Sequence, residues 1–169
     1  MNLRPATPAD LPAIRDLQIA SWQTTYRGIL TDAFLEVEVP KVLAQRWAEW
    51  PGPDWRVRTV WQGADLQGFV SLDLARNGGA YVDNLHVLPT LKGHGIGRRL
   101  MAAAASDTLA EGPGAMWLTV MEENTGARTF YRRIGGQERS VQVDLLFGQP
   151  VNAIPVQWEG AALEALAGV

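Results

Sequence analysis

The pattern of hydrophobic and polar positions divides the chain into a helical N-terminal part, a run of strands and a mixed C-terminal part. A short first strand is expected over residues 2–5. The segment Thr7–Asp10 then has the features of a helix start: an N-capping threonine, a proline in the first turn and an acid three residues after the cap. Apolar residues recur at helical spacing from Leu11 to Trp22, which predicts a helix that ends near Gly28.

Two more helix starts are expected at Thr31 and Pro40, ahead of a Pro-Gly-Pro break at residues 51–53. After residue 55 apolar and polar positions alternate, which is the period of a β-strand. Glycine-containing turns interrupt this alternation and indicate hairpins. We therefore expect an antiparallel meander of three strands over residues 55–62, 66–74 and 80–88.

The helical period returns near residue 95 and lasts to the turn Glu111–Gly114. The apolar strand 115–121 follows that helix, so it should lie parallel to the strand 80–88 in a right-handed crossover. The order of elements predicts an α/β (or α+β) fold with a mixed sheet in a single domain, residues 1–169. The remaining expected elements are a helix from Asn124 to Gly135, strands over about 138–147 and 151–158, and a short helix or frayed tail from Gly160.

The composition limits the possible functions. The chain has 169 residues, 47% of them hydrophobic and 20% charged, which is typical of one globular domain. A net charge of -3 gives no overall attraction to nucleic acid or to anionic membranes. The absence of cysteine excludes disulfides and thiolate ligands, and two histidines argue against a histidine-rich metal site. With no signal-peptide pattern and no apolar run of about 20 residues, we expect a cytoplasmic protein with no metal, nucleic-acid or membrane partner.

The segment Leu91–Leu100 is the most informative stretch. It lies between a predicted strand and a predicted helix, and its alternating glycines allow backbone amides to approach a ligand closely. The amides at the start of the helix favour an anion. Neither the dinucleotide pattern G-x-G-x-x-G nor the P-loop pattern is present. A tight turn that only packs the helix on the strand is the alternative interpretation. Four basic side chains favour a phosphate or pyrophosphate site: Lys92, His94, Arg98 and Arg99.

Four segments carry a resemblance to a known family. Lys92–Gly97 resembles the Gln/Arg-x-x-Gly-x-Gly/Ala loop of the GCN5-related N-acetyltransferases, the GNAT superfamily. Glu123–Gly135 resembles the second signature of that family, an asparagine that opens a helix ending in Phe-Tyr-x-x-x-Gly. Arg4–Asp10 and Trp22–Leu30 resemble its first strand and first two helices. The resemblance covers essentially the whole chain and implies a mixed, mostly antiparallel sheet of about six or seven strands flanked by about four helices.

Two positions depart from the family pattern. Lys92 stands where arginine or glutamine is usual, so it keeps a positive charge without the planar fork of arginine. Gly136 stands where a bulky phenylalanine often follows Gly135. The first departure concerns phosphate binding, and the second concerns only the packing after the helix.

The resemblance implies acetyl-coenzyme A as the acyl donor. Its pyrophosphate would bind the amides of the glycine loop, and its pantetheine arm would pair with the preceding strand as an added strand does. An amide of that strand would polarise the thioester carbonyl. Asn124 would bind the pantetheine or simply cap its helix. The expected cofactor-binding residues are Leu85, His86, Val87, Lys92, Gly93, His94, Gly95, Ile96, Gly97, Arg98, Asn124 and Tyr131.

Tyr131 is the expected general acid. Departure of coenzyme A leaves a thiolate, and a phenol with a reference pKa of about 10 can donate a proton to it. Tyr131 shares one helix face with Ala127, Phe130 and Ile134, so it should point toward the sheet. Its position seven residues after Asn124 matches the family. The alternative is a core tyrosine without a chemical role.

The amine that attacks the thioester must lose a proton, and Asp83 is the expected base. Strict alternation along the strand places it on the same face as Leu85 and Val87 and opposite His86. Tyr81 and Glu122 are weaker candidates, and an exposed aspartate without a role is the alternative. In relatives the region between the first helices shapes the acceptor site, here Trp22, Tyr26 and Arg27, although the aromatic residues could also be core.

The leading hypothesis is an acyl-coenzyme A-dependent N-acetyltransferase that acts by direct attack of a primary amine. Its first rival is a catalytically silent module that binds acyl-coenzyme A, and its second is a nucleotide-binding interaction protein that uses the same glycine loop. The acceptor, a small-molecule or a peptide amine, stays open at this stage. Association of two copies through the last strands stays open as well.

Overall fold

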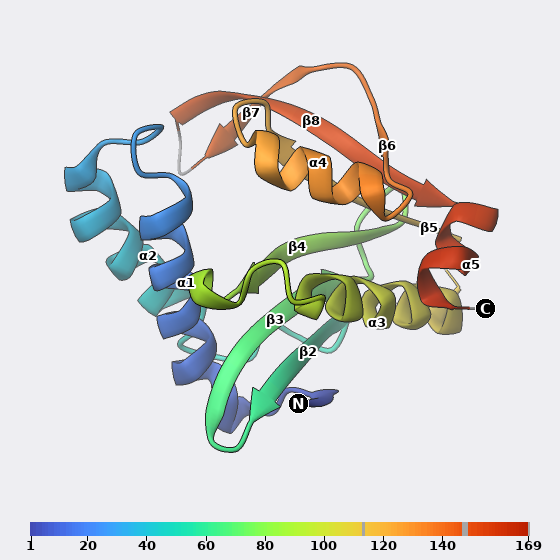
Figure 1. The fold of residues 1–169 in the computed structure, drawn as a ribbon, viewed down its shortest axis with the longest axis horizontal. Helices are drawn as coiled ribbons and strands as arrows, with labels where there is room; N and C mark the ends of the chain where they lie inside the picture. The colour runs from blue at the N-terminus through green and yellow to red at the C-terminus, as the bar shows by residue number, and fades with distance from the viewer. Residues whose placement is uncertain (113, 147–148, 169) are drawn as a thin grey trace.

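The computed structural model describes residues 1–112, 114–146 and 149–168, and Figure 1 shows its ribbon. Phe147, which the predicted strand 138–147 includes, lies outside the described residues. Eight strands form one sheet in the order β1-β2-β3-β4-β5-β8-β6, and β7 pairs with β8. Among the described residues the strands are β1 (Asn2–Pro5), β2 (Trp55–Gln62), β3 (Asp65–Asp73), β4 (Ala80–Val87), β5 (Ala115–Met121), β6 (Gln137–Glu138), β7 (Gln142–Leu146) and β8 (Gln149–Glu159).

The predicted mixed, mostly antiparallel sheet is confirmed. β4 and β5 form the parallel pair that the crossover predicted, and every other pairing described is antiparallel. The strand expected over 138–147 is divided into β6 and β7, which pair with different parts of β8. The described helices are α1 (Leu11–Thr25), α2 (Val39–Arg46), α3 (Ile96–Glu111), α4 (Thr125–Arg133) and α5 (Ala161–Ala167).

The capping signal at Thr7 forms as the sequence predicts. The backbone N–H and the hydroxyl of Thr7 both donate to Asp10 Oδ2, at 2.7 and 3.0 Å. Arg4 adds two hydrogen bonds to the same carboxylate, and together these contacts hold its pKa down, at about 2. One short 3₁₀ turn, Pro8–Asp10, then leads into α1. The cap therefore joins the first strand to the first helix.

The expectation of a separate helix start at Pro40 is wrong. A turn of π-helix, Phe34–Glu38, continues directly into α2, so Pro40 is the second residue of α2. The wider turn closes with a hydrogen bond from the Val39 amide to the Phe34 carbonyl. Proline has no amide hydrogen, and its ring needs space beside the preceding turn. A wider turn at this point accommodates it without ending the helix.

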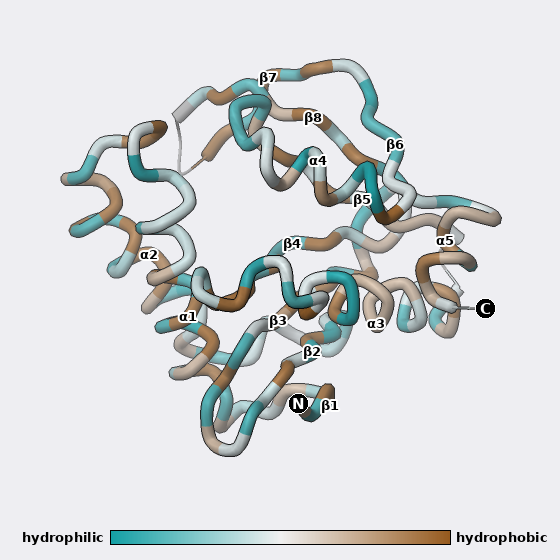
Figure 2. Tube along the Cα trace, viewed as in Figure 1, coloured by the Kyte–Doolittle hydropathy of each residue, from teal (hydrophilic) through white to brown (hydrophobic). Residues whose placement is uncertain are grey.

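The sheet separates two hydrophobic cores. α1 and α2 cover one face around Ile14, Leu35 and Phe69. α3, α4 and α5 cover the other face around Leu100 and Trp158. Figure 2 shows hydrophobic positions through β8 and hydrophilic positions on the outer side of α4. Each face of the sheet therefore has its own set of helices, and a functional site between the strands would be accessible from both layers.

A β-bulge in β4 overturns the predicted facing of two candidate residues. Leu72 pairs with Val82 but Ser71 pairs with Asn84, so Asp83 is an extra residue in β4. The bulge shifts the alternation by one position. Asp83 therefore faces α1 and α2, on the same side as His86, whereas we expected these two residues on opposite faces. For the same reason Asp83 does not share a face with Leu85 and Val87, which pack in the core beneath α3.

The outer side of β7 carries exposed apolar side chains. Val143 and Leu145 are 72% and 68% exposed, and Val141 just before the strand is 47% exposed. Association of two copies through the last strands stays a prediction. Within the described ranges, no helix has the length and apolar character that crossing a membrane requires.

Candidate active site

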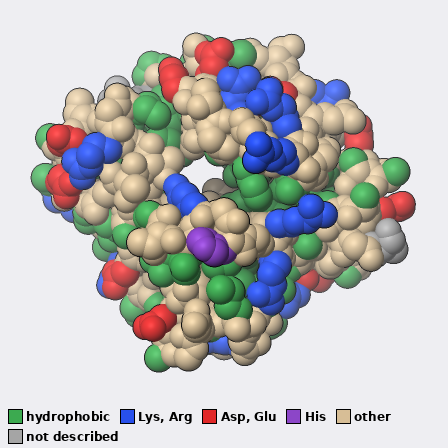
Figure 3. Space-filling model, in the orientation of Figure 1, with side chains coloured by type: hydrophobic (Ala, Val, Ile, Leu, Met, Phe, Trp, Pro, Cys, Tyr) green, Lys and Arg blue, Asp and Glu red, His purple; other side chains and the backbone are tan. Residues whose placement is uncertain are grey.

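The candidate site is a cavity where β4 and β5 separate. The two strands pair only at Ala80–Met116 and Tyr81–Trp117 and then diverge. Diverging parallel strands leave backbone groups without a neighbouring strand. A cavity of about 960 Å³ fills the gap and extends between α1, the glycine loop, α4 and β7. Figure 3 shows a central opening with Lys and Arg side chains on its rim.

The glycine loop and the start of α3 form one wall of the cavity. Gly93 and Gly95 have φ values of 86° and 79°, a left-handed conformation that favours glycine. Among the described residues no side chain caps α3, whose N-cap is Gly95, so its first amides are available to an anion. Lys92 and Arg98 line the cavity, as do the three loop glycines, and Lys92 Nζ also donates to Thr25 Oγ1 at 3.1 Å.

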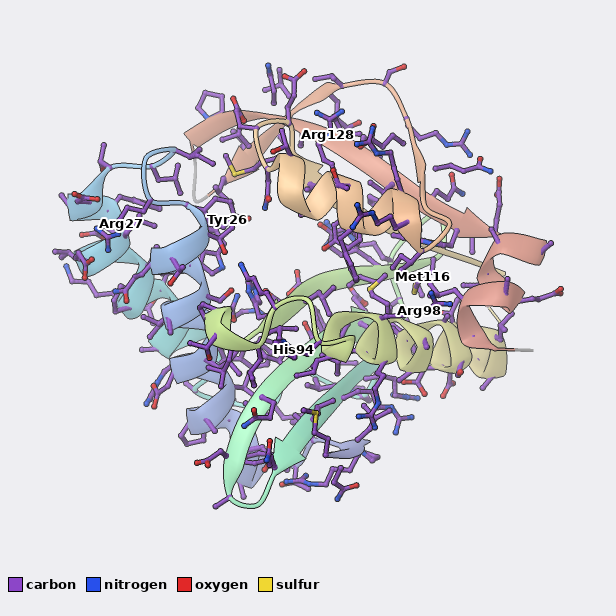
Figure 4. The ribbon with its side chains drawn as sticks, viewed as in Figure 1. Tyr26, Arg27, His94, Arg98, Met116 and Arg128 are labelled. Atoms are coloured by element: carbon purple, nitrogen blue, oxygen red, sulfur yellow. The ribbon has the colours of Figure 1, made fainter. Side chains whose placement is uncertain are left out.

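Two of the predicted loop residues do not line the cavity. The side chain of Ile96 is buried in the core, so only its backbone could contact a ligand. His94 is exposed on the outer side of the loop, where Figure 4 labels it, and its ring nitrogen lies 3.2 Å from the Lys92 carbonyl. Gly97 has a structural reason to be glycine, because a Cβ there would lie 3.2 Å from the Phe130 ring. This glycine lets α3 and α4 approach each other at the cavity.

Tyr131 lies in the wall opposite the loop. Its side chain is 9% exposed and its ring packs against Trp158 and Phe130. Burial raises the pKa of Tyr131, and the neighbouring phenols of Tyr26 and Tyr81 raise it further. The phenol is therefore protonated at neutral pH. Among the described residues, no side chain or backbone group forms a hydrogen bond with its oxygen.

All three tyrosines of the chain line this cavity. Tyr26, at the end of α1, is nearly buried, which raises its pKa, while a hydrogen bond with the Asn124 side chain opposes that shift. Asn124 is the N-cap of α4, and its Oδ1 accepts a hydrogen bond from the Ala127 amide at 3.1 Å. The capping role of Asn124 is thus present, and the same side chain connects α4 to α1 across the cavity.

His86 also lines the cavity, from β4. Its Nδ1 lies 2.9 Å from Ser21 Oγ, and its ring contacts the Phe69 ring. Burial, helped by the charge of Lys92, lowers the pKa of His86 to about 3. The ring is therefore neutral at physiological pH, which removes it as a cationic anchor for phosphate.

Asp83 is fixed by a chain of hydrogen bonds with one possible direction. The indole N–H of Trp47 can only donate, and it donates to Gln18 Oε1 at 2.6 Å. The Gln18 amide therefore donates to Asn84 Oδ1 at 2.6 Å, and the Asn84 amide donates to Asp83 Oδ2 at 2.6 Å. Arg46 donates to the same oxygen at 3.0 Å. The chain holds the carboxylate in the wall of the cavity and leaves its Oδ1 without a hydrogen-bond partner among the described residues.

The structure places two of the three predicted acceptor residues at the cavity. Trp22 and Tyr26 line the cavity and contact each other, with ring centroids 4.7 Å apart. Arg27 lies outside the lining, and its guanidinium pairs with Asp32 and Glu36 on the surface (Figure 4). Glu122, a weaker candidate base, also lies outside and accepts a hydrogen bond from Asn152.

Several residues of the site were not predicted from the sequence. Thr119 on β5 and Asp144 on β7 both line the cavity. The Tyr81 hydroxyl lies 3.0 Å from Thr119 Oγ1, and Thr119 Oγ1 lies 3.5 Å from Asp144 Oδ2. Arg46 on α2, which donates to Asp83, was not among the predicted site residues either. No local pattern marks these residues, because their contacts join segments far apart in the sequence.

Comparisons with known proteins agree with this geometry. A curated relative, the streptothricin acetyltransferase of Streptomyces lavendulae, is 39% identical over 72 residues, which are 42% of this chain and 38% of the relative. The chain thus spans less than half the length of that relative. The PaiA N-acetyltransferase of Thermoplasma acidophilum, solved with coenzyme A, superposes with a TM-score of 0.74 at 20% identity, covering 93% of this chain and 98% of that one.

A putative streptothricin acetyltransferase of Bacillus anthracis, solved with acetyl-coenzyme A, superposes with a TM-score of 0.57 at 21% identity, covering 65% of each chain. These likenesses show the fold. The sequence also matches the Acetyltransferase (GNAT) family over residues 12–136, about three quarters of the chain. The chain therefore belongs to the GNAT acetyltransferases, enzymes that use acetyl-coenzyme A as the acyl donor.

Proposed function

We propose that the protein transfers an acetyl group from acetyl-coenzyme A to a primary amine by direct attack, with Tyr131 as the general acid. The observation that carries the proposal is the Tyr131 phenol, which is buried, protonated and without a hydrogen-bond partner among the described residues, in a cavity between two separating strands. Tyr131 lines the cavity, where its phenol can donate a hydrogen bond to a bound ligand.

The residues of the cavity fit coenzyme A. The open amides at the start of α3, with Lys92 and Arg98 beside them, suit a pyrophosphate. Among the described residues, the part of β4 from Leu85 to Val87 has no partner on its β5 side, so its backbone is available to an extended amide arm such as pantetheine. Both features line the same cavity as Tyr131.

The transfer itself needs two proton movements. The amine nitrogen forms a bond to the acetyl carbon as the carbon–sulfur bond breaks, and the departing sulfur takes the proton that Tyr131 holds on its phenol oxygen. The amine must lose a proton, and we assign that proton to the free oxygen of Asp83, directly or through water. The Arg46 and Asn84 contacts orient that carboxylate toward the cavity. The proton taken up at Asp83 and the one lost from Tyr131 then exchange with solvent.

Release of free thiol from acetyl-coenzyme A in the presence of amines tests the proposal. The panel should contain small amines, peptides and streptothricin, the last because of the partial match to a streptothricin acetyltransferase. Tyr131→Phe should lower the rate about 100-fold, which is the usual contribution of general acid catalysis, with coenzyme A affinity nearly unchanged by calorimetry.

Tyr26→Phe is the matched control, because it removes a second nearly buried phenol of the same cavity. We expect a much smaller effect on the rate. An unchanged rate in Tyr131→Phe would remove Tyr131 from the mechanism. Coenzyme binding without thiol release for any amine would instead support the silent binding module.

A further inference from the structure

The charged side chains of the cavity are segregated. Three cations of the lining form no ion pair among the described residues, and they come from the glycine loop, α3 and α4: Lys92, Arg98 and Arg133. The carboxylates of the lining, Asp83 and Asp144, come from β4 and β7. The elements suited to phosphate therefore supply the unpaired cations, and other walls of the cavity supply the carboxylates.

The two carboxylates differ in their partners. Arg46 neutralises Asp83 at 3.0 Å. Within the described ranges, no lysine or arginine forms an ion pair with Asp144, whose Oδ1 accepts a hydrogen bond from the Leu145 amide at 2.7 Å. A negative charge at a substrate cavity without a cationic partner is a site for a cation supplied by the ligand.

Asp144 is also connected to the reacting part of the cavity. Its Oδ2 lies 3.5 Å from Thr119 Oγ1, which lies 3.0 Å from the Tyr81 hydroxyl, at the point where β4 and β5 separate. Tyr81, Tyr131 and Asp144 line the same cavity. A small molecule in that cavity can therefore meet both the Tyr131 phenol and the Asp144 carboxylate.

The amine that attacks the thioester has to be neutral when it reacts, so it cannot keep a charge that pairs with Asp144. We propose that Asp144 binds a second, still protonated amino group of the acceptor, and that the natural acceptors are amines with at least two basic groups. The transfer step rests on the function proposed above, but the binding of a diamine at Asp144 does not.

Thiol release with 1,4-diaminobutane and with n-butylamine tests this specificity. The wild-type protein should prefer the diamine, and Asp144→Asn should lower kcat/KM for the diamine on the order of tenfold, the usual worth of one charged hydrogen bond. The rate with n-butylamine and the affinity for coenzyme A should stay nearly the same. Asp65→Asn, at the exposed first residue of β3, is the matched control and should change neither rate.

Calorimetry of the diamine with the protein saturated with coenzyme A separates this inference from the proposed function. Binding of the diamine that weakens about tenfold in Asp144→Asn would support the cation site even if no amine released thiol. Equal preference for the two amines would overturn the inference while the transferase function stands. Diamine binding that is absent, or equal in Asp144→Asn and Asp65→Asn, would also overturn it.

Discussion

The hydrogen-bond chain from Trp47 to Asp83 predicts a stability effect of known direction. Trp47→Phe removes the only donor that reaches Gln18 Oε1 within the described part of the chain, and Gln18 is 3% exposed. A buried acceptor left without a donor costs about 1–3 kcal/mol. The smaller ring leaves a cavity beside Phe69, because the indole and the Phe69 ring pack edge to face with their centroids 5.6 Å apart. We expect a total loss of about 2–4 kcal/mol.

For a domain of this size each kcal/mol lowers Tm by about 2–4 °C, so Trp47→Phe should melt roughly 5–15 °C lower than the wild type. Trp50→Phe is the control for ring size, because Trp50 packs against the same core and forms no hydrogen bond among the described residues. Its effect should be clearly smaller. Scanning calorimetry gives Tm, and urea unfolding of the same samples gives the free energy of unfolding.

A double-mutant cycle tests whether the chain acts as a unit. Gln18→Leu removes the acceptor of Trp47 and the donor to Asn84, so Trp47→Phe should cost about 1 kcal/mol less in the Gln18→Leu background than alone. Additive effects within about 0.5 kcal/mol would refute the reasoning, since residues without coupling normally add to that accuracy.

Two further predictions concern packing and pH. Gly136→Ala should lower the free energy of unfolding, measured in urea, by about 1–3 kcal/mol, because its Cβ would lie 2.6 Å from the Trp158 ring. Gly126→Ala is the control, because no atom lies within 4 Å of its added Cβ. Equal urea midpoints for the two variants would contradict the prediction. His86 is neutral in the folded protein because burial lowers its pKa to about 3, whereas the unfolded chain takes up a proton below 6.5. The contribution of neutral His86 to the free energy of unfolding should therefore be fully present above pH 6.5. It should fall as the pH drops toward 3, by at most about 2 kcal/mol between pH 7 and 5. His86→Gln should remove that part of the slope, and an unchanged slope would rule the explanation out.

Local patterns made most of the fold predictable. The capping box at Thr7, the alternation from residue 55 and the glycine loop before α3 each depend on residues only a few positions apart. The parallel pairing of β4 and β5 followed from the handedness of a crossover through a helix. Tyr131 was placed inside by the spacing of one helix face, and the structure buries it at the cavity.

The contacts around Asp83 and Asp144 in the cavity could not be predicted in the same way. Gln18 and Asn84 are separated by 66 residues, and Thr119 and Asp144 by 25. Each of these side chains alone resembles an ordinary polar surface residue. Arg27 shows the opposite error: its position after the first helix suggested the acceptor site, but nearby acids pair with it at the surface.

The bulge in β4 connects the errors to the function. One extra residue at Asp83 turns its carboxylate toward α1 and α2 and returns Leu85 and Val87 to the core beneath α3. A bulge also bends its strand and increases the local twist. β4 leaves β5 just two residues before this point, after Tyr81. The same irregularity that defeats strict alternation therefore accompanies the opening of the sheet, and it places a carboxylate in the wall of the cavity.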